Sequence, residues 1–103
     1  MESVEKEHLI LGHTVMTHGV LEKTLSDPMF FYFMQRCLAR HFSSDFGSIE
    51  PDSKQANNLA IQSKRGNVLS CYYQDNGERV WIMTDYAGKG ENNRTTILFP
   101  DEY

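Results

Sequence analysis

The side chains that could carry catalysis do not form a recognised catalytic pattern. Ser70, His41 and Asp45 supply the residue types of a nucleophilic triad, but no G-x-S-x-G turn exposes the serine between a strand and a helix. Gly88-Lys89-Gly90 is glycine-rich but lacks the rest of the phosphate-loop pattern, so we interpret it as part of a mobile connection. We therefore expect no enzymatic activity.

Histidine residues are evenly spaced near the N-terminus, at His8, His13 and His18. In an extended strand this odd-numbered interval places successive side chains on opposite faces, so the three imidazoles would not converge on one metal ion. Zinc sites also use more closely spaced pairs of cysteine or histidine. We expect no metal site and no cofactor.

Ionisable side chains are densest at Arg40, His41, Asp45 and Asp85, near the expected ends of elements. Functional carboxylates cluster in this way, but structural ion pairs and loop caps do so too. An enzyme would use His41, Asp45 and Asp85 as its polar centre, and it would need a deep pocket that joins them.

Aromatic residues are concentrated in an expected hairpin and just after it: Tyr72, Tyr73, Trp81 and Tyr86. Such rings stack single-stranded bases when basic residues flank them, but Asp75, Glu78 and Asp85 offset the nearby positive charges. We expect alternate rings to pack on helices. A ring that faces outward would be typical of a protein interface.

The composition is that of one globular domain. The chain has 103 residues, of which 40% are hydrophobic and 23% charged. We expect a single domain over residues 1–103, with residues 1–7 flexible. Ten basic and fourteen acidic residues give a net charge of −4, which disfavours broad, sequence-independent DNA binding. The same charge is too small to indicate a DNA mimic.

No segment has the features of a secretory signal or a membrane span. The first seven residues are mostly acidic and polar, and the apolar cluster at residues 28–34 is far shorter than the roughly 20 residues of a membrane helix. Cys37 and Cys71 are interpreted as free, buried thiols, although a disulfide between them stays open. These features predict a cytoplasmic protein that does not contact membranes.

Hydrophobic periodicity predicts an α+β fold, in which a small antiparallel β-sheet packs against two main helices. The sheet would combine a C-terminal three-strand meander with an N-terminal strand. The expected strands cover residues 8–16, 68–74, 79–85 and 95–99, and the expected helices cover 28–41 and 50–63, with a short helical turn at 20–25. Asp75-Asn76-Gly77 predicts a type I′ hairpin turn.

Spacing also predicts which helix residues face the core. The first helix begins with an Asp27 N-cap and Pro28, and the second ends near a left-handed Gly66. The residues expected to be buried on the first helix are Met29, Phe30, Phe33, Met34, Cys37, Leu38 and His41, with Phe31 and Tyr32 broadening the face. Those expected on the second helix are Ala56, Leu59 and Ala60.

Five blocks of sequence occur in a recognisable order. Residues 40–47 read RHFSSDFG, 56–61 read ANNLAI, 68–72 read VLSCY, 81–84 read WIMT and 95–103 read TTILFPDEY. They resemble the motifs R-H-x-x-G-D-W-G, E-N-x-x-A-L, L-L-S-A-Y, W-I-I-T and T-T-I-L-x-P-x-E-Y. These belong to a family of short proteins carried by bacterial plasmids, prophages and integrative elements, often labelled plasmid-related protein or type I restriction endonuclease subunit M.

The resemblance covers the chain from about Leu11 onward and implies a mobile-element context. A literal methyltransferase subunit does not fit, because neither the length nor a glycine-rich cofactor motif is present. Where the family reads E-A-D-R-S before the double threonine, residues 85–94 form a longer loop, in which Arg94 can stand for the family arginine. Asn67 replaces another family arginine, so polar sites that depend on those residues are not carried over.

The function that we expect is inhibition of a host defence system, CRISPR or restriction, by a binding protein that occludes a partner surface. Acidic residues such as Glu50, Asp52 and Glu91 would meet Lys and Arg that normally bind phosphate, or would simply form a solvated surface. The candidate partner-binding residues are Arg40, Asp45, Asp75, Glu78, Trp81, Asp85, Tyr86, Glu91 and Arg94.

An alternative is a small nucleic-acid-associated regulator of plasmid or phage maintenance. It would need Arg36, Arg40, Lys54, Lys64 and Arg65 on one shared basic face. The expected partner is a host defence protein or complex, with direct nucleic acid as the alternative. The chain would be a monomer, or a homodimer if the hairpin edge is open to strand addition.

Overall fold

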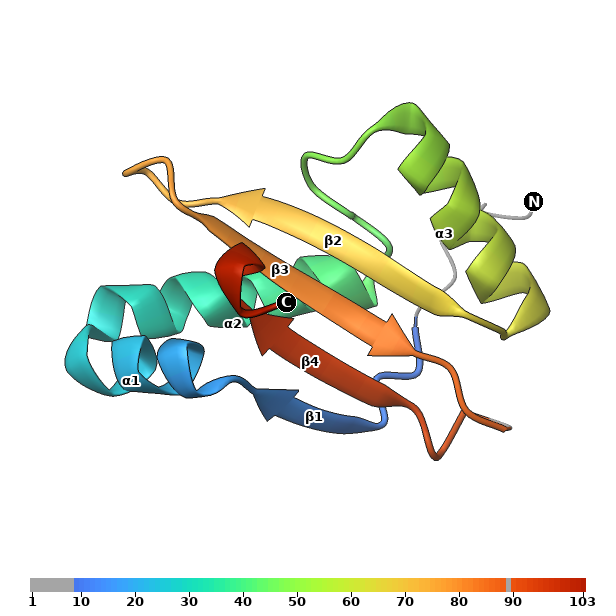
Figure 1. Cartoon of the computed structure of the whole chain (residues 1–103), viewed down its shortest axis with the longest axis horizontal. Coiled ribbons are helices and arrows are strands. Elements are labelled where there is room, and N and C mark those ends of the chain that lie inside the picture. The colour runs from blue at the N-terminus through green and yellow to red at the C-terminus, as the bar shows by residue number, and fades with distance from the viewer. Residues whose placement is uncertain (1–8, 89) are drawn as a thin grey trace, which may run out of the picture.

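A mixed four-stranded sheet and the helices around it make up the fold of the computed structural model, which describes residues 9–88 and 90–103 (Figure 1). The elements in chain order are β1 (His13–Met16), α1 (His18–Ser26), α2 (Pro28–Phe42), α3 (Pro51–Ser63), β2 (Asn67–Tyr73), β3 (Arg79–Asp85), β4 (Arg94–Leu98) and the short 3₁₀ helix η1 (Pro100–Glu102). The expected α+β class is confirmed.

The strand order is β1-β4-β3-β2, in which β2, β3 and β4 form the expected antiparallel meander. The N-terminal strand β1 instead pairs with β4 in parallel, with Val15 opposite Thr96, so the sheet is mixed rather than wholly antiparallel. Parallel neighbours need a long crossover connection, and here the segment between them carries all three α-helices.

The first strand is shorter than predicted, since β1 begins at His13 rather than near residue 8. Gly12 has φ of +64°, and a Cβ there would lie 2.0 Å from the Asn93 carbonyl oxygen, so the chain turns before the strand. Leu9 is buried beneath the end of α2, where its N–H donates to the Phe42 carbonyl at 3.0 Å. His8 lies outside the described residues.

The helix α2 begins as its sequence predicts. The Asp27 carboxylate accepts hydrogen bonds from the backbone N–H groups of Met29 and Phe30 at 3.1 and 3.4 Å, and Pro28 occupies the first turn. Before it, α1 begins at His18 and is a full nine-residue helix rather than a single turn.

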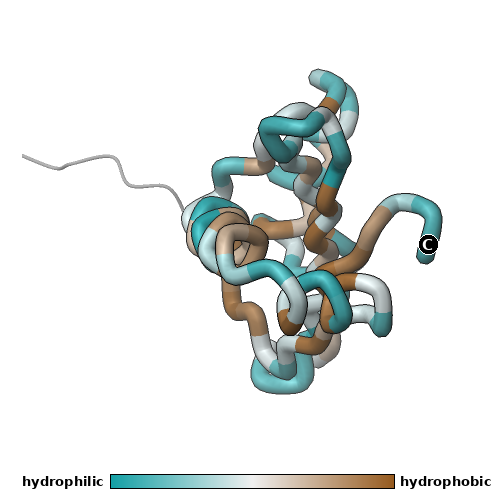
Figure 2. Tube along the Cα trace, turned by 90° about the vertical axis from the view of Figure 1, so that its left-hand side faces the viewer, coloured by the Kyte–Doolittle hydropathy of each residue, from teal (hydrophilic) through white to brown (hydrophobic). Residues whose placement is uncertain are grey.

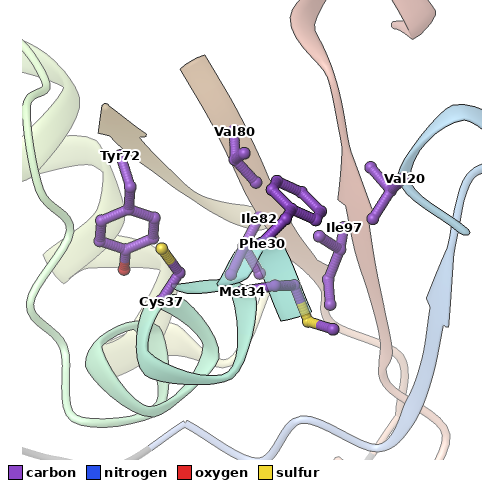
Figure 3. Close-up of a cluster of buried hydrophobic side chains, with 8 residues drawn as sticks. All are labelled: Val20, Phe30, Met34, Cys37, Tyr72, Val80, Ile82 and Ile97. Carbon is purple, nitrogen blue, oxygen red and sulfur yellow. The ribbon is translucent and has the colours of Figure 1, made fainter. Parts of the chain in front are cut away.

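The helices α1 and α2 cover one face of the sheet, which we call the inner face (Figures 1 and 2). The main cluster of buried apolar side chains lies between them and the sheet and comprises Val20, Phe30, Met34, Cys37, Tyr72, Val80, Ile82 and Ile97 (Figure 3). The buried stripe on α2 is narrower than expected, because Met29 is 76% exposed and Tyr32 62%, and Phe31 is also exposed. Only side chains directed at the sheet are covered, at the spacing of residues 30, 34, 37 and 41.

The helix α3 lies against the edge of β2 and shows a different face from the one predicted. Ala60 is buried as predicted, but Ala56 is exposed and Leu59 is 64% exposed, whereas Asn57 and Ile61 are buried. The amide of Asn57 decides this orientation, because its side-chain oxygen accepts from the Leu69 N–H at 3.0 Å and its NH₂ donates to the Leu69 carbonyl at 2.8 Å. The left-handed cap is Lys64, two residues before Gly66.

The free edge of β2 is therefore largely covered. Asn57 pairs with Leu69, and the loop before α3 pairs with Cys71, whose N–H donates to the Phe46 carbonyl and whose carbonyl accepts from the Ser48 N–H. A second copy of the chain could add a strand at the hairpin edge only by breaking these hydrogen bonds. The edge of β2 is therefore not open to the strand addition that we considered from the sequence.

Replacing Asn57 with alanine is expected to lower the free energy of unfolding by about 2 to 3 kcal/mol, because it leaves the Leu69 N–H and carbonyl without partners at a covered edge. Urea unfolding measures this loss. The matched control is Asn58→Ala, which removes an exposed amide from the next position of α3 and is expected to change little. Equal losses in both variants would contradict this role of Asn57.

The β2–β3 hairpin forms where it was predicted, but its turn differs from type I′. Gly77 has φ of +88°, whereas Asn76 keeps a negative φ. The Gly77 N–H donates to the Gln74 carbonyl at 2.9 Å, and the Gln74 N–H donates to the Glu78 carbonyl at 2.8 Å. This is a three-residue loop in which a type I turn is followed by a left-handed glycine.

Candidate functional site

His41 lies at the centre of a buried chain of hydrogen bonds between α2 and the sheet. Its ring is 0% exposed, with Nδ1 at 2.6 Å from the Ser70 Oγ and Nε2 at 2.9 Å from the Thr84 Oγ1. The chain continues from Thr84 to Thr95 at 2.7 Å, and Thr95 donates to the Leu11 carbonyl at 2.7 Å. These bonds join α2 to strands β2, β3 and β4.

The direction of every proton in this network follows from its last member. Thr95 donates its one hydroxyl proton to the Leu11 carbonyl, so in its contact with Thr84 it can only accept. Thr84 therefore donates to Thr95, and its oxygen accepts a hydrogen bond from His41 Nε2–H. Nδ1 is then bare and accepts from the Ser70 hydroxyl. Burial lowers the pKa of His41 to about 4, which keeps the ring neutral at pH 7 and agrees with this assignment.

The Ser70–His41 pair has the atoms of a nucleophilic dyad but not its accessibility. Both residues are 0% exposed, so a substrate cannot reach the Ser70 hydroxyl without local opening of the core. The pair instead satisfies polar groups inside the domain.

Asp45 is not part of this network, so the centre expected from His41, Asp45 and Asp85 does not form. The Asp45 carboxylate accepts from Arg40 Nε at 2.8 Å and Nη2 at 3.2 Å. The Arg40 guanidinium lies 4.7 Å from the centre of the Tyr72 ring, and the Tyr72 hydroxyl donates to the Asp45 carbonyl at 2.6 Å. These contacts secure the turn after α2. Asp85 stands at the far end of β3, in register with Arg94.

The cysteines lie on opposite sides of the sheet. Cys37 belongs to the inner cluster beside Tyr72 (Figure 3), whereas Cys71 precedes Tyr72 in β2 and therefore points to the other face. Both thiols are free, and burial raises the pKa of Cys37 to about 11. Among residues 9–88 and 90–103, no group of three His, Cys, Asp or Glu side chains could hold a metal ion. None of the described helices has the length and apolar character needed to cross a bilayer.

The other face of the sheet, which we call the outer face, is mainly apolar. The strand register forms two central rows across it, whose residues are Val15, Leu69, Cys71, Trp81, Met83, Thr96 and Leu98. The ends of the strands add Tyr73 and the polar or charged residues His13, Asn67, Arg79, Asp85 and Arg94. Trp81 and Met83 at its centre are partly exposed. Of the described elements, η1 is the one that lies over this face, on the side opposite α1 and α2 (Figures 1 and 2). The Tyr103 ring that follows η1 packs edge-on against Trp81, with 5.8 Å between ring centres.

The sequence-predicted partner residues do not form one site. Trp81, Asp85 and Arg94 share the outer face through the register of β3 and β4. Asp75 and Glu78 lie around the hairpin turn, near the other end of β3. The remaining four are elsewhere: Arg40 in the last turn of α2, Asp45 just after α2, Tyr86 against the smaller buried cluster, and Glu91 exposed in the loop before β4.

Tyr86 was predicted as a partner residue, and in the structure it is half-buried. Its ring packs against a second buried cluster, which comprises Leu9, Phe46, Ala60, Ile61 and Val68. Conversely, the prediction missed Leu69, Met83 and Val15 on the outer face. The signal was present in β2 and β3, where apolar residues occupy both alternating sets of positions, a pattern typical of strands covered on both faces.

The five basic residues that a nucleic-acid regulator would need come from two helices: Arg36 and Arg40 lie in α2, Lys54 lies in α3, and Lys64 and Arg65 follow α3. Lys54 lies in the first turn of α3 and Lys64 just after its end, about 15 Å apart along the helix axis. Arg40 lies in the last turn of α2 and is paired with Asp45. Lys54 instead lines a groove of about 560 Å³ between α3 and the preceding loop, opposite Asp45.

No family model, curated protein or solved structure matches this chain. The fold and the site define an α+β domain with one face of its sheet covered by helices and an apolar opposite face, which a short C-terminal segment covers in part.

Proposed function

We propose that this chain is a binding protein of a mobile genetic element that inhibits a host defence system, CRISPR or restriction. It would act by docking its outer face onto a component of that system and occluding the surface beneath. The mobile-element context comes from the resemblance of its sequence blocks to plasmid and prophage proteins. The docking surface comes from the geometry of the sheet.

The observation that carries the proposal is the apolar outer face centred on Trp81. Five of the seven side chains in its central rows are large apolar or aromatic groups: Val15, Leu69, Trp81 and Met83 are half-buried, and Leu98 is buried. Contiguous apolar surface of this kind on one side of a domain is typical of an interaction site. Covering it contributes about 25 cal/mol per Å² of apolar area, and tryptophan is among the most common energetic anchors of protein interfaces.

The net charge of the chain supplies the reason for choosing a defence protein, whereas the charges at the ends of the outer face are of both signs. Asp85 lies in register with Arg94 and His13 at one end, and Glu78 precedes β3 at the other. With a net charge of −4, the chain is complementary to the basic surfaces with which CRISPR and restriction proteins bind nucleic acid. Complementary charge speeds association and suppresses wrong partners, while the apolar centre holds the complex.

The test is affinity capture with the tagged chain from a host that carries active CRISPR and restriction systems, with nuclease treatment in parallel. We expect recovery of one stoichiometric CRISPR or restriction component that nuclease does not release. Met83→Glu, at the centre of the outer face, is expected to lose this component. The matched control is Leu59→Glu on α3, which places the same charge on an exposed apolar residue away from the face.

Three results would overturn the proposal. Partners that disappear with nuclease would indicate a nucleic-acid-associated regulator instead. Equal capture by Met83→Glu and Leu59→Glu would exclude the outer face. Recovery of no defence component in either arm would exclude the inhibitor. Circular dichroism shows whether Met83→Glu is folded, and Leu69→Glu repeats the test in the neighbouring strand.

A further inference from the structure

Residues 100–103, which we call the C-terminal segment, lie over the outer face, whereas Phe99 just before them packs against the inner cluster, with its ring 5.8 Å from that of Phe30. The C-terminal segment is held at one carboxylate. Glu102 Oε1 accepts from the Thr17 hydroxyl at 2.6 Å and from the Phe99 N–H at 3.0 Å, and Glu102 Oε2 accepts from the Gly19 N–H at 2.9 Å. These bonds tie the end of the chain to the start of α1, more than eighty residues earlier in the sequence.

The start of α1 is shaped to receive this carboxylate. Thr17 is the N-cap residue, but its side chain makes no bond to its own helix and donates to Glu102 instead. The first N–H groups of a helix lack partners within it and favour negative charge. Gly19 has no side chain in the way, whereas a Cβ at this position would lie 2.6 Å from Glu102 Oε2.

Apart from the hydrogen bonds of this carboxylate, the C-terminal segment makes few contacts with the rest of the protein. None of the residues of η1 is buried, and Tyr103 is 80% exposed although its ring packs edge-on against Trp81. A segment attached through one exposed anchor and one ring contact exchanges with solvent far more easily than a buried element does. The segment makes two contacts: its carboxylate binds Thr17 and Gly19, and its ring packs on Trp81. A partner segment that took its place would have to supply the same two groups.

We propose that residues 100–103 are a displaceable cover of Trp81, and that the partner of the outer face replaces them with an acidic–aromatic segment of its own. This inference rests on the proposed function for the identity of the partner, but the cover itself is a property of the chain alone. The receptor consists of the Thr17 hydroxyl, the Gly19 N–H and the Trp81 ring. In the free protein, Glu102 and Tyr103 occupy it.

The first part of the test uses Trp81 fluorescence, because Trp81 is the one tryptophan of the sequence. Glu102→Gln weakens the anchor from the side of the segment, and Gly19→Ala blocks it from the side of the receptor. Both variants are expected to raise the acrylamide quenching constant of Trp81 severalfold. Asp101→Asn, which neutralises the neighbouring exposed carboxylate, is the matched control and is expected to match the wild type.

Gly19→Ala keeps the test independent of folding. Gly19 lies inside α1, where alanine is the better helix former, so the helix is expected to persist while the carboxylate is excluded. Wild-type quenching in both Gly19→Ala and Glu102→Gln would overturn the cover.

The second part adds a synthetic four-residue peptide with the sequence of residues 100–103. We expect this peptide to restore protection of Trp81 in Glu102→Gln, whose receptor is intact, but not in Gly19→Ala, whose receptor is blocked. A peptide with glutamine in place of the glutamate is expected to have no effect. Equal protection of both variants, or none in Glu102→Gln, would overturn the receptor for an acidic–aromatic segment. Either outcome is independent of whether a defence protein is captured.

Discussion

Replacing His41 with leucine is expected to lower the free energy of unfolding by about 2 to 5 kcal/mol at pH 7. The change removes both ring nitrogens, so the Ser70 hydroxyl loses its acceptor and the Thr84 oxygen loses its donor. The Ser70 hydroxyl and the Thr84 oxygen each stay buried with one hydrogen bond lost, which costs about 1 to 3 kcal/mol for each group. Urea unfolding of the variant beside the wild type measures the loss.

A compensated variant separates the polar network from simple packing. In this variant, His41→Leu is combined with Ser70→Ala and Thr84→Val. The two added changes remove the hydroxyls that bonded to His41 and nearly keep the shape of the core. Thr95 retains its hydrogen bond to the Leu11 carbonyl. Removing both partners of a buried hydrogen bond is far less costly than removing one. We expect this triple variant to recover most of the lost stability. No recovery would mean that the loss comes from packing and not from the network.

Acidification is expected to destabilise the protein through the same residue. The pKa of His41 is about 4 in the folded protein because of burial, and its ordinary value is 6.5. Between these values the unfolded chain binds a proton that the folded protein does not, so stability falls as the pH falls. The contribution of His41 is complete above pH 6.5 and is lost progressively toward pH 4, by about 3 kcal/mol in total.

The measurement is the free energy of unfolding of the wild type at intervals from pH 7 to 4, minus that of the triple variant. Carboxylates contribute to the acid response of both proteins, so the difference isolates His41. A difference that stays constant over this range would show that His41 is not held neutral in the core.

Local signals in the sequence were sufficient where a single element decides the structure. Asp27 followed by Pro28 predicted the start of α2, and the Asn-Gly pair predicted the β2–β3 hairpin. They were insufficient where distant segments decide it. Asn57 looks like a surface residue of α3, but its amide pairs with the backbone of β2 and turns the expected face of the helix outward.

The candidate site shows the same division. His41 and Asp45 lie close in sequence and looked like members of one polar centre, yet the first points into the core and the second pairs with Arg40 outside it. Trp81 was predicted as a partner residue, but its neighbours on the outer face depend on strand register, which spacing along one strand does not reveal. The bonds from Glu102 to the start of α1 have no local signal at all.

The central claim is that the outer face around Trp81 is the surface that meets the partner. It is tested most directly by fluorine NMR of the chain labelled with fluorotryptophan, to which the captured defence component is added. Since Trp81 is the one tryptophan in the sequence, the spectrum has a single reporter. We predict that its signal shifts and broadens in proportion to the complex formed. A signal that keeps the position and width of the free protein when the complex is saturated would contradict the claim.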